Sequence, residues 1–260
     1  MFGFLRRHHR EGVKKQPFPD AWLKVLSKNV PMYAKLSAED QTELRGHIQV
    51  LIDEKTFEGC GGLEISDEIK VTIAAQASML LLHRETDYYP ELETILVYPH
   101  TFMAKTKRVE GGVVIEGESA RLGESWSRGV VVLAWDNVLA GARDMYDGHN
   151  VVLHEFAHQL DTEDGVADGA PVLPKGSMYG PWARVLGSEF EQLVRDEHAH
   201  RRSVMDFYGA TDPAEFFAVI TETFFEKPRQ LKAKHPELYE QLKAYYQQDP
   251  AARMTPAGQG

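Results

Sequence analysis

The chain has 260 residues, 43% of them hydrophobic, so it can bury a large core and is not an intrinsically disordered protein. Its formal net charge of −10 disfavours a nucleic-acid-binding protein. Its single cysteine, Cys60, excludes an internal disulfide and a cysteine-rich zinc site, so any metal must be held by histidine or carboxylate side chains.

The first 85 residues are predicted to form an N-terminal helical region packed on the rest. Ser37 and Ser66 each precede an apolar-periodic segment, as helix N-caps do. The basic cluster at 6–10 is interpreted as a solvated tail, with a contact to anionic lipid or an acidic partner as the alternative. The chain has no secretory signal and no apolar stretch of ~18 residues, so we expect a cytoplasmic protein without a membrane span.

Strands are predicted in the middle of the chain, at 92–105, 111–122 and 129–135, forming one small sheet. The run at 129–135, GVVVLAW, has two interpretations. It is either an edge strand, to which an extended substrate peptide could add, or an internal core strand. The residues alone do not separate these two.

From residue 150 onward the pattern is helical again. The order of helices, strands and helices predicts an α+β fold, mostly helical with a small mixed sheet. We expect a helical region at 1–85, a second domain at 86–248 and a flexible tail at 249–260.

Residues 154–158 read His-Glu-Phe-Ala-His, the H-E-x-x-H motif of zinc peptidases. On a helix capped by Asn150, His154 and His158 lie one turn apart on one face and can grip one zinc ion. Glu155 can then act as the general base on the attacking water. The alternative is a pair of core histidines hydrogen-bonded to the backbone. Asp161, one turn further on, either supports a ligand or is an ordinary polar residue at the helix end. The domain at 86–248 is therefore expected to be a zincin-like catalytic domain.

A third ligand does not follow at the spacing of the extended motif H-E-x-x-H-x-x-G-x-x-H, because aspartates replace its glycine and its third histidine. His198 and His200 lie in a polar run and are expected to be solvated. An acidic residue downstream is the better candidate.

Glu215 and Glu222 are the two candidates, two turns apart on one face of a predicted helix. Glu215 is also explained as the acid of a capping box that begins at Asp212. Glu222 has a second acid, Glu226, one turn later. The spacing alone leaves the choice open.

The segments HEFAHQLD (154–161) and YGATDPAEFFA (208–218) resemble the two signatures of the Mlc titration factor A (MtfA) family, and the same pair recurs in the catalytic domain of anthrax lethal factor. The resemblance implies that Glu215 is the third zinc ligand, that Tyr208 lies near the metal as a catalytic residue, and that Glu222 is a supporting acid. The alternative for Tyr208 is a buried aromatic at a turn.

The resemblance also implies a function: a metallopeptidase with one Zn²⁺ that cleaves peptides, including aminopeptidase-type substrates. It further implies binding of the repressor Mlc, with an effect on glucose phosphotransferase regulation. Two alternatives stay open. One is a repressor-binding protein with a structural zinc and little hydrolytic activity, and the other is a zinc hydrolase acting on a non-peptide amide or ester. A general base such as Glu155 distinguishes a catalytic site from a structural one.

Overall fold

The computed structural model describes residues 2–100, 102–110, 113–121, 123–127 and 129–253. Its N-terminal part is mostly helical, as predicted, with α1 (Phe2–Lys14), α2 (Asp20–Asn29), the 3-10 helix η1 (Pro31–Lys35), α3 (Ala38–Glu54) and α4 (Asp67–Met79). The interpretation of residues 6–10 as a solvated tail is wrong, because they belong to α1, and the buried Arg10 side chain donates to Glu54 at 2.7 Å and to Asp87 at 2.6 Å. Ser37 caps α3 by accepting a hydrogen bond from the Asp40 N–H at 3.0 Å, and Ser66 caps α4 by accepting one from the Ile69 N–H at 3.3 Å. Both serines satisfy backbone groups that a helix leaves free at its start.

A four-stranded mixed sheet follows, in the order β1 (Thr56–Gly59), β2 (Thr94–Tyr98), β6 (Val130–Ala134) and β5 (Gly123–Ser127). β1, β2 and β6 are parallel, whereas β5 is antiparallel to β6. The register places Thr94 opposite Val130 and Tyr98 opposite Ala134. β6 is buried along nearly its whole length, which accounts for its continuous apolar sequence.

The interpretation of 129–135 as an edge strand is wrong, because β2 and β5 flank β6 on its two sides. The alternative, an internal core strand, is correct. An uninterrupted apolar run suits a strand with both neighbours in place, whereas edge strands usually carry charges or prolines that prevent unwanted pairing. β5 ends the sheet on this side instead.

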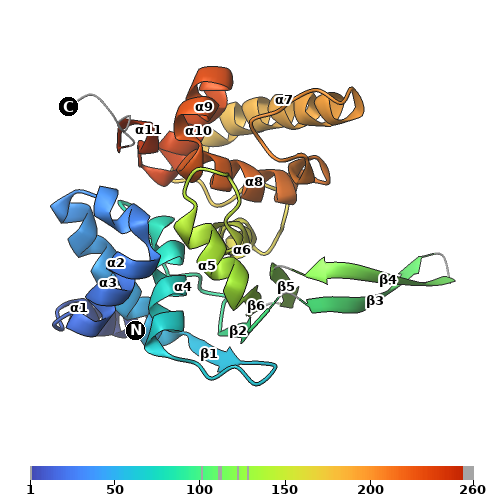
Figure 1. Ribbon diagram of the computed structural model, residues 1–260. Coiled ribbons are helices and arrows are strands. Elements are labelled where there is room, and N and C mark those ends of the chain that lie inside the picture. The colour runs from blue at the N-terminus through green and yellow to red at the C-terminus, as the bar shows by residue number, and fades with distance from the viewer. Residues whose placement is uncertain (1, 101, 111–112, 122, 128, 254–260) are drawn as a thin grey trace.

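A second β structure is the antiparallel hairpin of β3 (Phe102–Glu110) and β4 (Val113–Arg121). The sequence predicted these strands as members of the same sheet as β2. The two strands pair with each other instead, and the hairpin projects from the body of the molecule (Figure 1). Positions 101, 111–112 and 122 of the predicted strands lie outside the described residues.

The C-terminal part of the described chain is helical, with α5 (Trp135–Arg143), α6 (Val151–Asp161), η2 (Thr162–Asp164), η3 (Gly176–Met178), α7 (Tyr179–His198), η4 (Phe207–Ala210), α8 (Pro213–Glu226), α9 (Pro228–Lys234), α10 (Pro236–Tyr246) and α11 (Pro250–Arg253). Among the described helices, none is long and apolar enough to cross a membrane. The predicted fold class is confirmed: the chain is α+β, mostly helical, with a small mixed sheet and an N-terminal helical region.

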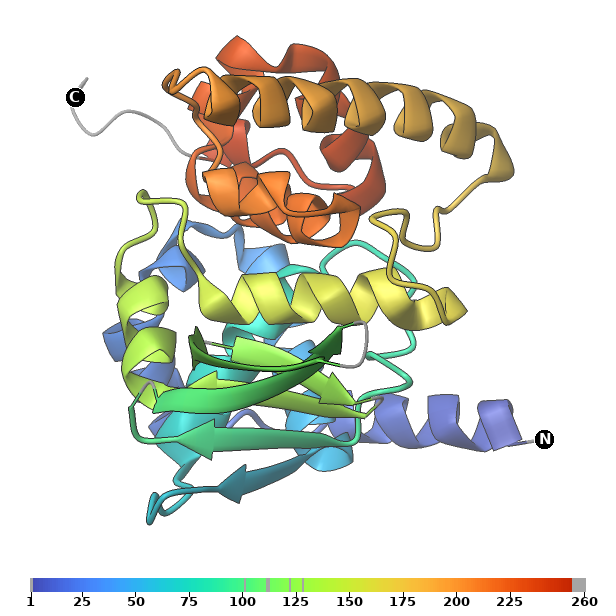
Figure 2. The same cartoon turned by 90° about the vertical axis from the view of Figure 1, so that its right-hand side faces the viewer.

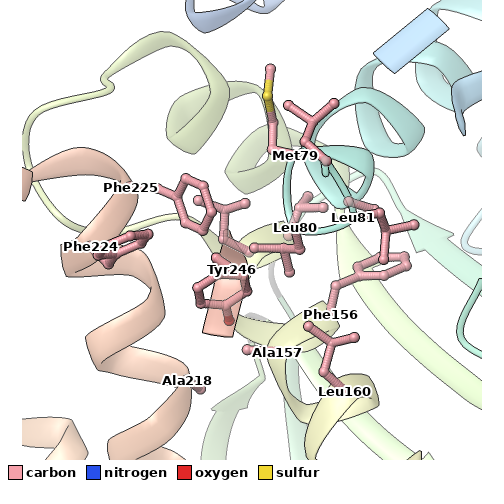
Figure 3. Close-up of a cluster of buried hydrophobic side chains, with 14 of the residues drawn as sticks. Met79, Leu80, Leu81, Phe156, Ala157, Leu160, Ala218, Phe224, Phe225 and Tyr246 are labelled. Carbon is pink, nitrogen blue, oxygen red and sulfur yellow. The ribbon is translucent and has the colours of Figure 1, made fainter. Parts of the chain in front are cut away.

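Helix α6 lies at the centre of this arrangement, between the sheet and α8 (Figure 2). Phe156 and Leu160 of α6 point into a cluster with Leu80 and Leu81, which follow α4, and with aromatic side chains of α8 and α10 (Figure 3). Each such side chain contributes ~1.5–3 kcal/mol when fully buried, so α6 is fixed from several directions. The N-terminal helices share this core, and a boundary between 1–85 and 86–248 stays a prediction.

The flexible tail was predicted to start at residue 249, which is too early. Asp249 accepts hydrogen bonds from the Tyr239 hydroxyl at 2.6 Å and from Lys243 Nζ at 2.7 Å, and α11 follows it. Arg253 at the end of α11 forms an ion pair with Asp40 of α3 at 3.2 Å. These long-range contacts hold a segment whose composition alone gave no sign of order. Residues 254–260 lie outside the described residues.

Candidate metal centre

The H-E-x-x-H residues lie on α6, whose start is fixed by Asn150. The Asn150 side-chain oxygen accepts hydrogen bonds from the N–H groups of Val152 at 3.1 Å and Leu153 at 3.0 Å. This is the N-cap that the sequence predicted. The helix therefore presents His154 and His158 on one face, with ring centroids 4.9 Å apart.

Glu215 reaches the two histidines from α8. Its backbone N–H is capped by the Asp212 carboxylate at 2.9 Å, as the capping interpretation predicts. Its own carboxylate points the other way: Oε2 lies 3.0 Å from His154 Nε2 and 3.4 Å from His158 Nε2. The two interpretations of Glu215 are therefore compatible, because its backbone belongs to the cap and its side chain to the site.

The three facing atoms fit a zinc ion. The two histidine Nε2 atoms are 3.2 Å apart, and both lie 3.0–3.4 Å from Glu215 Oε2. Donor atoms held 2.0–2.1 Å from one ion in a tetrahedral arrangement lie about 3.4 Å from each other. Two imidazoles and one carboxylate are also a donor set of catalytic zinc sites that keep a fourth position for water. The assignment of these residues as ligands stays a prediction.

The two carboxylates that face the His154 ring also favour a cation beside it. Its Nδ1 lies 2.8 Å from Glu222 Oε1, and its Nε2 faces Glu215, so both ring nitrogens face oxygens that accept. A neutral imidazole can donate from one nitrogen only. Burial opposes a positive charge here, yet the hydrogen bonds to Glu215 and Glu222 outweigh it and raise the pKa of His154 to about 10. A metal ion at Nε2 would replace that second proton.

Glu222 and Glu155 occupy different places around these donors. Glu222 contacts the ring nitrogen of His154 that faces away from Glu215, where carboxylates orient metal-bound histidines. Glu155 is almost fully buried, and its Oε2 has no hydrogen-bond partner among the described residues. Burial raises the pKa of the Glu155 carboxyl group, while the nearby histidines lower it. Because buried carboxylate oxygens usually have a hydrogen-bond partner, Glu155 Oε2 is available to bind a polar group that enters the site.

Tyr208, from η4, is placed beside the same residues. Its hydroxyl lies 3.4 Å from Glu215 Oε1, and its ring centroid is 5.9 Å from that of His154. The side chain is 56% exposed, so the alternative of a buried aromatic at a turn is wrong. Partial burial and the charge of Glu215 raise the pKa of Tyr208 to about 12, so the hydroxyl keeps its proton at neutral pH and can donate a hydrogen bond.

Asp161 lies at the end of α6 but has another partner. It is fully buried, and its Oδ2 accepts a hydrogen bond from the Gly169 N–H at 2.9 Å, while the Gly169 carbonyl accepts one from Trp182 Nε1 at 3.1 Å. Asp161 therefore anchors the loop after α6 through Oδ2, and a supporting role toward a ligand stays a prediction. The Asp168-Gly169 pair is typical of a turn, but the sequence could not reveal its contact with Asp161, which depends on how the loop folds back. His198 and His200 are exposed, as predicted.

Comparison with known proteins identifies the family of this chain. The family model described as glucose-regulated metallo-peptidase M90 matches residues 4–247. The chain is 42% identical to an uncharacterized protein of Synechocystis sp. over 238 residues, 91% of this chain and 86% of the relative. It is 31% identical to the Mlc titration factor A proteins of Serratia proteamaculans and Pectobacterium atrosepticum, in each case over 239 residues, 90% of this chain and 88% of the relative. A family match over nearly the whole chain shows that this protein belongs to the M90 family of glucose-regulated metallopeptidases.

Proposed function

We propose that the protein is a zinc-dependent peptidase in which His154, His158 and Glu215 hold one Zn²⁺. The observation that supports this most is the spacing of their three facing atoms, 3.0–3.4 Å apart, in a chain that belongs to a metallopeptidase family. A cytoplasmic location, drawn from the sequence, belongs to the same proposal.

Bound zinc would supply a Lewis acid that activates water and polarises a peptide carbonyl. Glu155 then takes a proton from the attacking water and passes it to the leaving amine. Its position supports this role, because it lies between the two histidines in sequence and its Oε2 has no partner among the described residues. Tyr208 donates a hydrogen bond to the oxyanion that develops on the carbonyl oxygen. Its exposure leaves its hydroxyl accessible to a substrate.

The substrate peptide is proposed to add to β5. This strand ends the sheet and contacts α6, so a peptide paired with it would run beside the metal. The test uses a short substrate whose backbone amides are N-methylated one at a time. Methylation at alternate positions should raise KM by about fivefold, because each lost hydrogen bond is worth ~1 kcal/mol. Equal KM values for all methylated peptides would refute pairing with a strand.

The decisive experiment combines metal analysis with peptide hydrolysis by the wild-type protein and Glu155→Gln. Both proteins should hold one zinc ion per chain, because Glu155 is not a ligand. Hydrolysis should fall by ~10²-fold or more in the variant, the usual contribution of a general base. Full activity in Glu155→Gln would overturn the mechanism. A blocked and an unblocked peptide of the same sequence then test the aminopeptidase-type preference.

A second candidate function is repressor binding, favoured by the name Mlc titration factor A of two relatives. It is compatible with peptidase activity. Calorimetric titration of an Mlc-type repressor from the source organism with Glu155→Gln measures binding without cleavage. Repressor binding by the variant, together with no peptide cleavage by the wild-type protein, would favour the regulatory role with a structural zinc. Cleavage by the wild-type protein without repressor binding would leave the peptidase function alone.

A further inference from the structure

The start of α6 is held by more hydrogen bonds than an N-cap needs. The Asn150 side chain is buried and uses its whole hydrogen-bonding capacity. Its oxygen caps the helix, so its Nδ2 group is the donor to the Gly141 carbonyl at 3.2 Å and to Glu226 Oε1 at 3.1 Å. An aspartate caps a helix equally well but offers no donor. The two bonds from Nδ2 are therefore the part of this site that specifies asparagine.

Two acidic residues of α8, Glu222 and Glu226, bind the segment at the start of α6. Glu222 accepts a hydrogen bond from the Asn150 N–H through Oε2 and contacts His154 Nδ1 through Oε1. Glu226, one turn later, accepts from the Gly148 N–H at 3.0 Å and from Asn150 Nδ2. Both carboxyl groups thus bind the segment that leads into α6, and Glu222 also binds a side chain of α6 itself.

This network lies between the two helices that carry the metal site. His154 belongs to α6 and Glu215 to α8, so the 3.0 Å distance between their facing atoms depends on how these helices are placed on each other. Metal sites require their ligands to be held within about 0.5 Å. Helix α5 also lies close to this segment. A Cβ added at Gly141 of α5 would lie only 3.0 Å from Asn150 Cα, so glycine is needed for this packing.

We propose that Asn150 and Glu226 are positioning residues of the metal site, which fix the start of α6 on α8 and thereby set the distance between His154 and Glu215. The proposal rests on the metal site of the proposed function. It assigns no contact with zinc or substrate to either residue, and the effect passes through Glu222 and the helix backbone.

The main test is the zinc affinity of Asn150→Asp, measured by competition with a chromophoric chelator. This variant keeps the cap oxygen but places an oxygen against the Gly141 carbonyl and Glu226. Zinc should bind up to about 10-fold more weakly, the lower end of the effect of direct partners of metal ligands, because Asn150 acts through Glu222 and the helix backbone. The visible spectrum of the Co²⁺-substituted protein should change in band position, because the donor geometry changes. An affinity within twofold of wild type, with an unchanged spectrum, would mean that Asn150 is only a helix cap.

A second variant, Glu226→Gln, leaves the cap of α6 intact and covers the case in which Asn150→Asp does not fold. Burial raises the pKa of Glu226 to about 9, so the side chain is neutral at pH 7 and glutamine matches its charge. Glutamine leaves one of the two N–H donors without an acceptor, and zinc should bind several-fold more weakly. Unchanged zinc affinity in Glu226→Gln would refute its positioning role.

The matched control is Ser37→Ala, which removes the N-cap of α3, outside the metal site. It should lose ordinary cap stability in thermal unfolding but bind zinc like the wild type. An equal loss of zinc affinity in this control would show that general destabilisation, and not positioning, weakens the metal.

Amide exchange of the zinc-free protein separates this proposal from the proposed function. Exchange at the N–H groups of Gly148 and Asn150, which donate to Glu226 and Glu222, should be at least tenfold faster in Asn150→Asp than in wild type. Slow exchange in a wild-type protein that binds no zinc would refute the metal site while leaving the network. Equal exchange in variant and wild type would refute the network itself.

Discussion

Gly169 offers a sharp test of how the loop after α6 is packed. Its φ is +75°, a conformation that glycine adopts readily and other residues do not. A Cβ added there would lie 2.3 Å from the Pro213 carbonyl oxygen and 2.9 Å from its carbon. Pro213 is the first residue of α8 and lies two residues before Glu215. In Gly169→Ala, either the loop must leave α8 or the start of α8 must move.

The loss of stability in Gly169→Ala follows from the positive φ and from the close contact with Pro213. A left-handed backbone costs a residue with a Cβ about 1–2 kcal/mol. Relieving a contact of 2.3 Å with backbone requires a shift of roughly 1 Å, and overpacking of this kind costs about 1–3 kcal/mol. Gly169→Ala should therefore lower the free energy of unfolding by about 2–5 kcal/mol. Zinc affinity should fall as well, because Glu215 moves with the start of α8.

Urea denaturation of Gly169→Ala and Gly176→Ala measures the difference. Gly176 lies in the same loop, and a Cβ there would meet nothing within 4 Å, so its substitution should change stability by less than ~0.5 kcal/mol. A Gly169→Ala protein as stable as this control, with unchanged zinc affinity, would show that the loop does not pack on Pro213 as described.

Two further predictions concern the ligand choice and the pH dependence of stability. Glu215→Ala should lose far more zinc affinity than Glu222→Ala, about 10²-fold or more against about 10-fold, and the reverse order in a chelator competition would contradict the assignment. His83 lies 2.7 Å from Asp40 Oδ1 and 3.0 Å from the Gln247 carbonyl oxygen. Although burial opposes its charge, hydrogen bonds to Gln247 and Asp40 raise the pKa of His83 above 6.5. The stability that it contributes is thus complete below the unfolded pKa of about 6.5 and is lost as the pH rises through the raised value. His83→Asn, which tolerates the local φ of +64°, should flatten melting temperature against pH in this window, and an unchanged curve would refute the role of His83.

Local sequence patterns were sufficient to predict the site residues that lie on a single helix. The spacing of His154 and His158 and the cap at Asn150 depend on helix geometry, which short sequence segments determine. The structure accordingly places both histidines on α6, with Asn150 as its N-cap, as predicted. The N-terminal helices also followed from hydrophobic periodicity and caps, and a small sheet was predicted, although its strands β1 and β5 were not.

Features that depend on how helices and strands pack against each other could not be predicted from local sequence patterns. Glu215 and Glu222 share one helix face, and both contact His154, but they meet opposite nitrogens of its ring. Periodicity treats the two acids alike, so only the position of α8 against α6 distinguishes them. The neighbours of β6 were equally invisible, because an apolar strand suits several places in a sheet. The order of residues 249–253 depends on Asp40, which is far away in sequence.

The last described residues of the chain contact its N-terminal part. The Gln248 side chain donates to the Met79 carbonyl at 2.7 Å, His83 contacts the Gln247 carbonyl, and Arg253 pairs with Asp40. Helix α6 thus lies between segments that the ribosome releases early and segments that it releases late. Synthesis proceeds at about 5–20 residues per second, so the helices preceding α6 wait for seconds before their C-terminal partners emerge. The contacts that join the two ends of the described chain therefore form only after residue 253 has been synthesised.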